Sequence, residues 1–267
     1  MKKFGLIGEK LPHSFSKILH GIAFDVLGLD FEYELYEVSK ESAIHIKEFM
    51  NKYNLNGLNV TIPYKQVVMD NIDVISTEAK RIGAVNTILN ADGVLYGYNT
   101  DYYGFKYTLE NNNIDVKNKK VVVLGSGGAS KAVLACLEDL KASKVYLVSR
   151  NKENKKVARD VELIDYEGLK SVKGELIVNT TPVGMYPNTD FSPVYEDILS
   201  NFNVSVDVIY NPLVTKFMKI SKKLGKRTYS GLEMLIMQGL RSEEIWNDFK
   251  ISKEDIGIII NKVKKEI

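Results

Sequence analysis

A glycine-rich turn between a hydrophobic strand and an apolar helix constrains this chain more than any other segment. The predicted strand Val121–Leu124 runs into Gly125-Ser126-Gly127-Gly128-Ala129-Ser130, and a helix is expected over Ala129–Leu140. Glycines permit a tight turn, and the backbone amides at the positive end of a helix bind phosphate. This order is typical of a dinucleotide-binding fingerprint, with the small Ser130 at its third position. An ordinary tight strand–helix turn is the alternative interpretation.

The end of the next strand indicates which dinucleotide would bind. The strand expected at Lys144–Val148 is followed by Ser149-Arg150-Asn151-Lys152, with no acid before Glu153. NAD enzymes usually place Asp or Glu here to bind the ribose 2′-hydroxyl. Arginine pairs instead with a 2′-phosphate. The sequence therefore favours NADP (NADPH), although a surface arginine at a strand end would look the same.

Apolar runs alternate with helical patterns in the rest of the chain. In the first half we expect strands at Phe4–Ile7, Phe31–Tyr36 and Gly57–Val60, and helices at Phe15–Leu27 and Ser42–Tyr53. This alternation indicates an α/β layer with a largely parallel sheet. A hairpin is expected between Ala84–Asn90 and Val94–Tyr98, because the intervening Asp-Gly tolerates positive φ.

The second half continues the βαβ pattern. Further strands are expected at Glu175–Asn179 and Val204–Val208, and helices at Asp101–Glu110, Leu232–Trp246 and Lys253–Lys264. A length of 267 residues favours two domains. The predicted fold class is α/β: an N-terminal α/β substrate domain plus a C-terminal Rossmann-like, doubly wound dinucleotide-binding domain. We expect the first to span residues 1–100, completed by helices within 232–267, and the second to span 101–231.

Composition excludes several classes of function. The 36 basic and 34 acidic side chains give a net charge of +2, so no basic stripe argues for nucleic acid and nothing favours an anionic membrane. No apolar run is long enough for a signal peptide or a membrane span. The single cysteine, Cys136, cannot form an intrachain disulfide and lies on a predicted buried helix face. We expect a cytoplasmic protein without a metal, because no His/Cys/carboxylate cluster has ligand spacing.

Six short polar motifs carry a family resemblance. Four lie in the first half: Pro12-His13-Ser14-Phe15-Ser16, Asn59-Val60-Thr61-Ile62-Pro63-Tyr64-Lys65, Gly83-Ala84-Val85-Asn86-Thr87 and Gly97-Tyr98-Asn99-Thr100-Asp101. Two lie in the second: Asn179-Thr180-Thr181-Pro182-Val183-Gly184-Met185 and Gly231-Leu232-Glu233-Met234-Leu235-Ile236-Met237-Gln238. In this order, and with the glycine turn, the chain resembles the shikimate dehydrogenase family over nearly its whole length.

The resemblance implies reversible, NADPH-dependent reduction of 3-dehydroshikimate to shikimate, a step of aromatic amino-acid biosynthesis. Lys65 and Asp101 would be the catalytic pair. The substrate-binding residues would be Ser14, Ser16, Thr61, Lys65, Asn86, Asp101, Tyr210 and Gln238, with the two serines on the ring carboxylate. The cofactor contacts would be Gly125, Ser126, Gly127, Gly128, Ala129, Ser130, Ser149, Arg150, Asn151, Lys152, Val208 and Gly231.

The chemistry of these side chains agrees with the roles that the resemblance implies. Reduction of a ketone needs a proton and a positive charge for the developing alkoxide, and Lys65 can supply both while Asp101 orients it. Structural alternatives exist: Ser14, Ser16 or Asp101 could cap a helix, and Asn86 could satisfy backbone groups. Gln238 lies on or beside an apolar stripe, where an unpaired amide is costly.

Four departures from the family pattern and two competing interpretations bear on this hypothesis. Lys17 stands where proline is common, Tyr64 where histidine is frequent and Gly239 where alanine is usual, and Tyr102, in place of a frequent glycine, adds bulk beside Asp101. An NAD-dependent quinate/shikimate dehydrogenase is the close alternative, against which Arg150 argues. A protein that senses a shikimate-like ligand or NADP without turnover is the more distant one. The sequence also leaves the choice between a monomer and a homodimer open.

Overall fold

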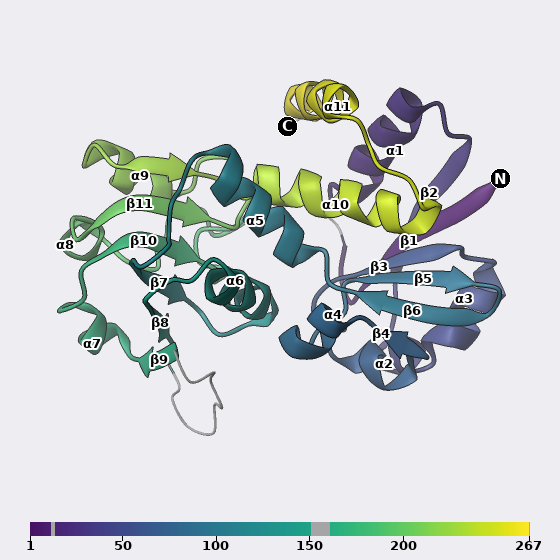
Figure 1. Cartoon of the computed structure of the whole chain (residues 1–267), viewed down its shortest axis with the longest axis horizontal. Coiled ribbons are helices and arrows are strands. Elements are labelled where there is room, and N and C mark those ends of the chain that lie inside the picture. The colour runs from purple at the N-terminus through teal and green to yellow at the C-terminus, as the bar shows by residue number, and fades with distance from the viewer. Residues whose placement is uncertain (12–13, 151–160, 267) are drawn as a thin grey trace. The chain divides into compact units, whose positions relative to one another are not determined.

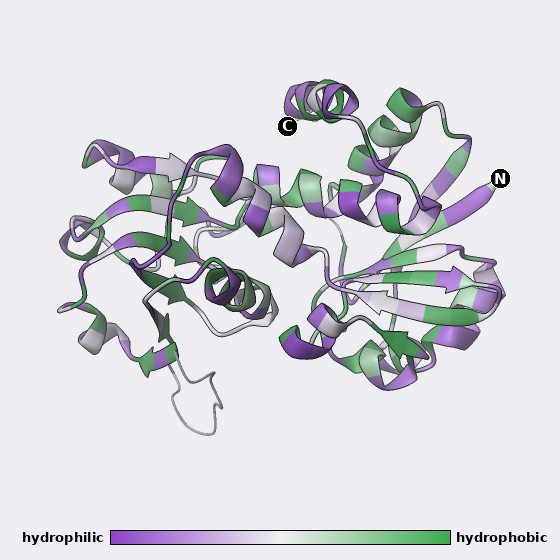
Figure 2. Cartoon of the chain, viewed as in Figure 1, coloured by the Kyte–Doolittle hydropathy of each residue, from purple (hydrophilic) through white to green (hydrophobic). Residues whose placement is uncertain are grey.

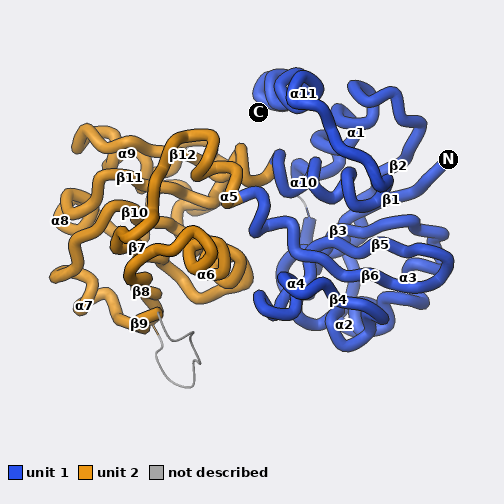
Figure 3. Tube along the Cα trace, viewed as in Figure 1, with its two compact units in different colours: residues 1–104, 236–267 blue, residues 105–235 orange. Residues whose placement is uncertain are grey.

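The computed structural model describes residues 1–11, 14–150 and 161–266 (Figure 1). The predicted cofactor contacts Asn151 and Lys152 lie outside these residues. The chain divides into two compact units: residues 1–104 with 236–267, and residues 105–235 (Figure 3). Helices α5 (Asp101–Asn111) and α10 (Leu232–Asn247) each contribute residues to both units.

The sheet of the first unit is mixed. Its strands, in the order β2-β1-β3-β5-β6-β4, are Phe31–Glu37, Lys2–Gly8, Gly57–Val60, Thr87–Ala91, Val94–Tyr98 and Val74–Ile75. β1 is parallel to β2 and β3, whereas β5 is antiparallel to both β3 and β6. Three of the five strand pairings are parallel, and the predicted hairpin β5–β6, which is confirmed, makes the sheet mixed because β5 pairs antiparallel with β3.

Helices cover both faces of this sheet because its strands alternate their side chains. Phe4 and Leu6 of β1 pack with Trp246 of α10 and with α1 (Ser16–Leu27), whereas Ile7 packs on the opposite face. That opposite face is covered by α2 (Lys40–Ile44), α3 (Ile46–Tyr53), α4 (Thr77–Ile82) and the short 3-10 helix η1 (Val67–Asn71). The last helix, α11 (Lys253–Glu266), packs on α1.

One predicted helix is divided in the structure. The sequence suggests a continuous helix over Ser42–Tyr53, but the backbone leaves the helical region at His45, with φ −88° and ψ 44°. The apolar residues on each side still point to the same core, where Ala43, Ile46 and Met50 are fully buried. The break thus turns the chain without changing which side chains it buries, and an apolar spacing cannot reveal such a turn.

The sheet of the second unit is entirely parallel. Its strands, in the order β12-β11-β10-β7-β8-β9, are Arg227–Tyr229, Phe202–Asp207, Gly174–Asn179, Lys120–Leu124, Lys144–Val148 and Val161–Ile164. The order of strands reverses at β7, which lies between β10 and β8. The doubly wound fold predicted for this half is confirmed, and ligands of such folds bind at the carboxyl ends of the strands beside the reversal.

Apolar strands form the centre of this unit, as the green strands β7, β10 and β11 in Figure 2 show. Val122 and Leu124 of β7 pack in one cluster with residues of α7 (Tyr166–Leu169), α8 (Glu196–Leu199) and α9 (Lys216–Lys223). Helix α6 (Gly128–Asp139) follows β7 and buries Cys136 completely. The glycine turn therefore lies at the carboxyl end of the central strand.

Gly231 gives a direct test of this packing, because a Cβ atom there would lie 2.0 Å from the carbonyl oxygen of Val208. We expect Gly231→Ala to lower the free energy of unfolding by at least about 2 kcal/mol. Gly257→Ala in α11 is the matched control, since a Cβ atom added at Gly257 would meet nothing within 4 Å. It should raise stability by roughly 0.5–1 kcal/mol. Urea unfolding measures both; a stable Gly231→Ala variant would contradict the close contact.

Candidate functional site

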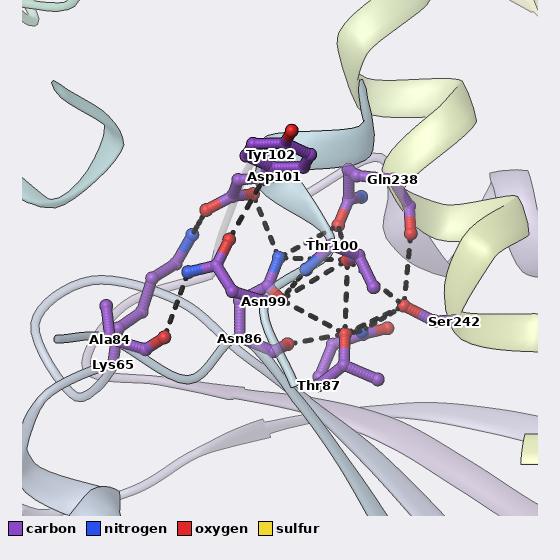
Figure 4. A network of polar contacts seen from close by, with 11 residues as sticks. Lys65, Ala84, Asn86, Thr87, Asn99, Thr100, Asp101, Tyr102, Gln238 and Ser242 are labelled. Carbon is purple, nitrogen blue, oxygen red and sulfur yellow. Dashed lines mark hydrogen bonds and ion pairs between the residues drawn. The ribbon is translucent and has the colours of Figure 1, made fainter. Parts of the chain in front are cut away.

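An ion pair joins Lys65 and Asp101 in the first unit (Figure 4). The Lys65 ammonium lies 2.6 Å from Asp101 Oδ2. Lys65 follows β3, and Asp101 is the first residue of α5. The two side chains are only 18% and 10% exposed, so water screens their attraction less than at an open surface. The structure thus brings together the two residues predicted as the catalytic pair.

Asn86 holds the second oxygen of Asp101. Its Nδ2 donates to Asp101 Oδ1 at 2.9 Å, while its Oδ1 accepts from the backbone N–H of Thr100 at 2.7 Å. Since a backbone N–H can only donate, the second bond fixes which end of the Asn86 amide faces Asp101. Both carboxylate oxygens of Asp101 therefore have donors, and the carboxylate has one defined orientation. The expectation that Asn86 satisfies backbone groups also holds, because it does so for Thr100.

Further buried polar residues surround Asn86, and the sequence did not single them out as site residues. They are Asn59, Thr87, Thr100 and Ser242, all joined by hydrogen bonds. Figure 4 shows the last three of them. Gln238, which was predicted, accepts from Asn86 and Thr100 at 3.4 Å each. Ser242 lies four residues after Gln238 on α10, one helical turn away. That spacing was the only signal that could have identified it.

The helix-capping alternatives for the predicted residues do not describe the structure. The N-cap residue of α1 is Phe15, and Ser14 Oγ accepts instead from the backbone N–H of Ser16 at 3.3 Å. At the start of α5, Asn99 Oδ1 accepts from the Tyr102 N–H at 3.4 Å. Asn99 thus takes the capping role suggested for Asp101. The two oxygens of the Asp101 carboxylate accept hydrogen bonds from Lys65 and Asn86 instead.

Thr61 and Tyr102 border the ion pair in sequence. Thr61 follows β3, is partly exposed, and accepts through its backbone carbonyl from the N–H of Tyr64. Tyr102 is 7% exposed, and its ring meets that of Tyr103 edge-on, with centroids 5.3 Å apart. The bulk that this tyrosine adds beside Asp101 is therefore buried.

The glycine turn of the second unit leaves open space at the start of a helix. Gly125 has φ +93°, and a Cβ there would lie 2.7 Å from Thr181 Cγ2, so both conformation and contact demand glycine. At Gly127 and Gly128, by contrast, an added Cβ would meet nothing within 4 Å. Gly127 is the N-cap of α6 and has no side chain to bind the first amides. The open backbone fits the pyrophosphate of a dinucleotide.

Ser149 and Arg150 extend this turn along the end of β8. Ser126 Oγ and Ser149 Oγ are 3.2 Å apart, and Ser130 Oγ donates to the carbonyl oxygen of Gly127 at 2.6 Å. Arg150 is exposed. Its charge also acts on Tyr166, where burial raises the pKa of the phenol and the guanidinium opposes that rise. An exposed arginine beside the serine turn fits a ribose 2′-phosphate.

Val208 and Gly231, two predicted cofactor contacts that are distant in sequence, lie against each other. The N–H of Gly231 donates to the carbonyl oxygen of Ile209 at 2.9 Å, and the close approach to Val208 excludes any side chain at Gly231. The predicted substrate residue Tyr210 follows in the same segment and is partly exposed. The second unit therefore brings these three residues to the carboxyl end of β11.

Asp207 anchors that segment, and sequence reasoning missed its role. Its carboxylate is fully buried and accepts from Asn179 Nδ2, the Ile209 N–H and Thr215 Oγ1, at 3.0, 3.1 and 2.6 Å. Burial raises the pKa of Asp207 to about 6, although these three donors oppose the rise. Asn179 Oδ1 in turn accepts from the N–H and hydroxyl of Thr181. One carboxylate thus joins the loops that follow β10 and β11.

The described part of the chain contains neither a candidate metal site nor a candidate membrane span. Within residues 1–11, 14–150 and 161–266, His, Cys, Asp and Glu side chains form no group of three that could hold a metal ion. Among the same residues, no helix combines the length and the apolar character needed to cross a bilayer.

Comparison with known proteins identifies relatives over the full length. Residues 6–88 match the family model of the shikimate dehydrogenase substrate binding domain. The chain is 47% identical to the shikimate dehydrogenase (NADP(+)) of Clostridium beijerinckii, with 95% of each chain covered. It superposes on the crystal structure of shikimate dehydrogenase 1 from Peptoclostridium difficile with a TM-score of 0.95 and 47% identity, covering 100% and 99% of the two chains. A Thermus thermophilus shikimate 5-dehydrogenase in complex with NADP(H) and shikimate is 29% identical, with a TM-score of 0.85 and coverage of 98% and 100%.

The raised pKa of Asp207 predicts that the free energy of unfolding depends on pH. Because its pKa is raised from 3.8 to about 6 on folding, its contribution is fully present below about pH 4 and is lost as the pH rises through 6. The loss amounts to about 3 kcal/mol. We expect Asp207→Asn to remove it, so the stability of this variant relative to wild type should rise by about that amount between about pH 4 and pH 7.

Urea unfolding at several pH values measures this difference. Asp73→Asn is the control, because the Leu95 N–H and Lys47 lower the pKa of the exposed Asp73. Its stability relative to wild type should therefore stay constant above about pH 5. An Asp207→Asn curve parallel to that of the wild type would contradict the predicted dependence.

Proposed function

The chain belongs to the shikimate dehydrogenase family, and we propose that it interconverts 3-dehydroshikimate and shikimate with NADP, in aromatic amino-acid biosynthesis. The observation that carries the proposal is the 2.6 Å pair between Lys65 and Asp101, with Asn86 on the second carboxylate oxygen. A binding protein that senses the ligand without turnover has no need of such a pair. The names of the relatives, all shikimate dehydrogenases (NADP(+)) among the most similar curated ones, support the same reaction.

Lys65 is proposed as the proton donor and acceptor at the reacting oxygen. NADP supplies the chemistry of hydride transfer when it is bound. In reduction, the Lys65 ammonium gives a proton to the developing alkoxide and stabilises its charge; in oxidation, the lysine takes the proton back. Asp101 keeps the ammonium oriented, because its Oδ2 accepts a hydrogen bond from one of the three N–H groups of Lys65. The other two N–H groups can donate to the substrate.

The other predicted substrate residues suit a polyhydroxylated carboxylate. Ser14 and Ser16 are proposed to bind the carboxylate, while Thr61, Asn86, Tyr210 and Gln238 meet the ring and its hydroxyls. Short polar side chains that pair with each hydroxyl strongly discriminate against analogues that lack one. Such discrimination separates shikimate from a generic alcohol.

We propose that the first unit binds the substrate and the second binds NADP. The pyrophosphate would lie on the backbone of Gly125, Ser126, Gly127, Gly128, Ala129 and Ser130, and the 2′-phosphate near Ser149 and Arg150. Val208 and Gly231 would line the nicotinamide end. An NAD-dependent quinate/shikimate dehydrogenase is the second candidate, and the exposed Arg150 at the end of β8 argues against it.

The partners we propose are therefore shikimate, 3-dehydroshikimate and NADP, all small molecules. The single, fully buried Cys136 suits a reducing cytoplasm, which is where we expect the protein to act. A monomer and a homodimer are both compatible with these assignments.

Substitution of the lysine tests the reaction. We expect Lys65→Ala to lower kcat for shikimate oxidation by roughly 10²–10⁴-fold while the Kd for shikimate changes far less, because the lysine acts on the reacting oxygen. Absorbance of NADPH gives the rate, and calorimetry gives the affinity. Lys47→Ala, which removes an exposed lysine paired with Asp73, is the control. Near-normal turnover in Lys65→Ala would remove this lysine from the mechanism.

Substitution of the arginine tests the cofactor. Arg150→Ala should raise the KM for NADP by about tenfold or more, because it removes a charge-assisted partner of the 2′-phosphate, and should leave the KM for NAD nearly unchanged. Arg227→Ala, at another exposed arginine of the second unit, controls for the loss of charge. A wild-type enzyme that prefers NAD, or equal effects on both cofactors, would refute the assignment of NADP to Arg150.

A further inference from the structure

A tyrosine in the first turn of α5 lies on the other side of that helix from the Lys65–Asp101 pair. Tyr103 follows Asp101 by two residues. Two residues turn an α-helix by about 200°, so the two side chains leave nearly opposite sides of α5. Tyr103 is half-buried, and it meets residues of α4 and α10. The reaction proposed above gives this tyrosine no role.

The hydroxyl of Tyr103 ties the first turn of α5 to α4. It donates a hydrogen bond to the carboxylate of Glu78, which lies in the first turn of α4. Burial, followed by the hydrogen bond and charge of Glu78, raises the pKa of Tyr103, and Arg241 opposes the rise. The phenol therefore keeps its proton and remains the donor in this bond.

Helix α4 belongs to the same local frame as Lys65 and Asn86. The chain leaves α4 and reaches Asn86 within a few residues, just before β5. On the way, the N–H of Val85 donates to the carbonyl oxygen of Lys65 at 2.7 Å. A hydroxyl bound to α4 therefore fixes α5 against the backbone that holds both partners of Asp101.

Arg241 of α10 packs on the ring of Tyr103. Its guanidinium carbon lies 5.0 Å from the centroid of the ring, close enough for a cation–π attraction. Its Nη1 donates to Glu244 Oε2 at 2.6 Å, which holds the guanidinium in place. Gln238 precedes Arg241 by three residues on α10, and residues at this spacing share a face of a helix. The ring of Tyr103 therefore meets α10 on the face that carries Gln238.

We propose that Tyr103 is a positioning residue, which sets the first turn of α5 so that Asp101 faces Lys65. Its two supports are the acceptor on α4 and the cation on α10. The proposal rests on the proposed function, in which Asp101 orients the lysine. Rates depend steeply on such alignment, since a displacement of about 1 Å can lower a rate by about 10²-fold. Loss of one support should cost less, because Asn86 still binds Asp101.

Removal of the hydroxyl tests this role with little change of shape. Tyr103→Phe keeps the ring under Arg241 but leaves Glu78 without its donor. We expect it to lower kcat for shikimate oxidation by about three- to tenfold, with the KM for shikimate changed less than about twofold, because the other substrate residues stay in place. Glu78→Ala removes the acceptor and should give the same loss. Glu78→Gln keeps an oxygen that accepts from the phenol, and its kcat should stay within about twofold of wild type.

Two double-mutant cycles show through which groups Tyr103 acts. In the Glu78→Ala background, Tyr103→Phe should lower kcat no further, since the acceptor is already gone. In the Asp101→Asn background, which has a low kcat of its own, Tyr103→Phe should also have almost no further effect, because no carboxylate remains to be aligned. A tyrosine that serves stability alone would lower kcat by the same factor with and without Asp101.

The experiment is NADP-coupled oxidation of shikimate at saturating substrate, with thermal melting of each variant. Tyr36→Phe is the matched control, because this half-buried tyrosine of the first unit packs on Phe49 and Tyr53 and touches none of the helices α4, α5 and α10 through its ring contacts. It should keep the kcat of the wild type even if its melting temperature falls.

Unchanged kcat in Tyr103→Phe, or an equal loss in the wild-type and Asp101→Asn backgrounds, overturns the role of Tyr103 alone. If Tyr103→Phe does not fold, equal rates in Glu78→Ala and Glu78→Gln overturn it, and a loss confined to Glu78→Ala supports it. A wild-type protein without turnover of shikimate overturns the function and this role together.

Discussion

The partly buried pair of Lys65 and Asp101 is the interaction on which the polar architecture of the first unit depends. Two charges removed from water lose several kcal/mol of hydration each, and their attraction compensates only when the geometry is good and the remaining lone pairs are satisfied. Asn86 meets that condition for Asp101 by occupying the second oxygen. Asn86 is itself held by Thr100 and Thr87, and those residues by Asn59 and Ser242. The carboxylate thus explains why so many polar side chains are buried in one place.

The fold brings these side chains together from segments that are far apart in the chain. Asn59 lies within β3, Thr87 begins β5, and the antiparallel pairing of these two strands sets the two residues opposite each other. Ser242 arrives on α10 from near the end of the chain. The antiparallel pairing in this mixed sheet therefore places Thr87 within hydrogen-bonding distance of Asn59.

Local features were predictable from the sequence, and contacts between distant segments were not. The glycine turn, the Asp-Gly hairpin and the doubly wound second half follow from short-range chemistry and from alternation of elements. Lys65, Asp101, Asn86 and Gln238 were identified through motifs. Asp207 carries no local signal, since aspartate is common at the ends of strands, and the only local signal of Ser242 is its spacing of four residues from Gln238 on α10. Their importance arises only from what tertiary structure places beside them, as does the mixed order of the first sheet.

In the second unit, too, the sequence does not reveal which contact each glycine makes. Gly125, Gly127 and Gly231 look equivalent in sequence, but each meets a different physical demand. Gly125 needs a left-handed backbone and lies close to Thr181, Gly127 leaves the start of a helix open, and Gly231 presses against the carbonyl of Val208. The packing of the chain explains Gly125 and Gly231, whereas no packing contact explains Gly127, whose open backbone suits the proposed pyrophosphate. Glycines that resemble one another in sequence therefore differ in what they do, and substitution of each one should separate packing from the proposed binding.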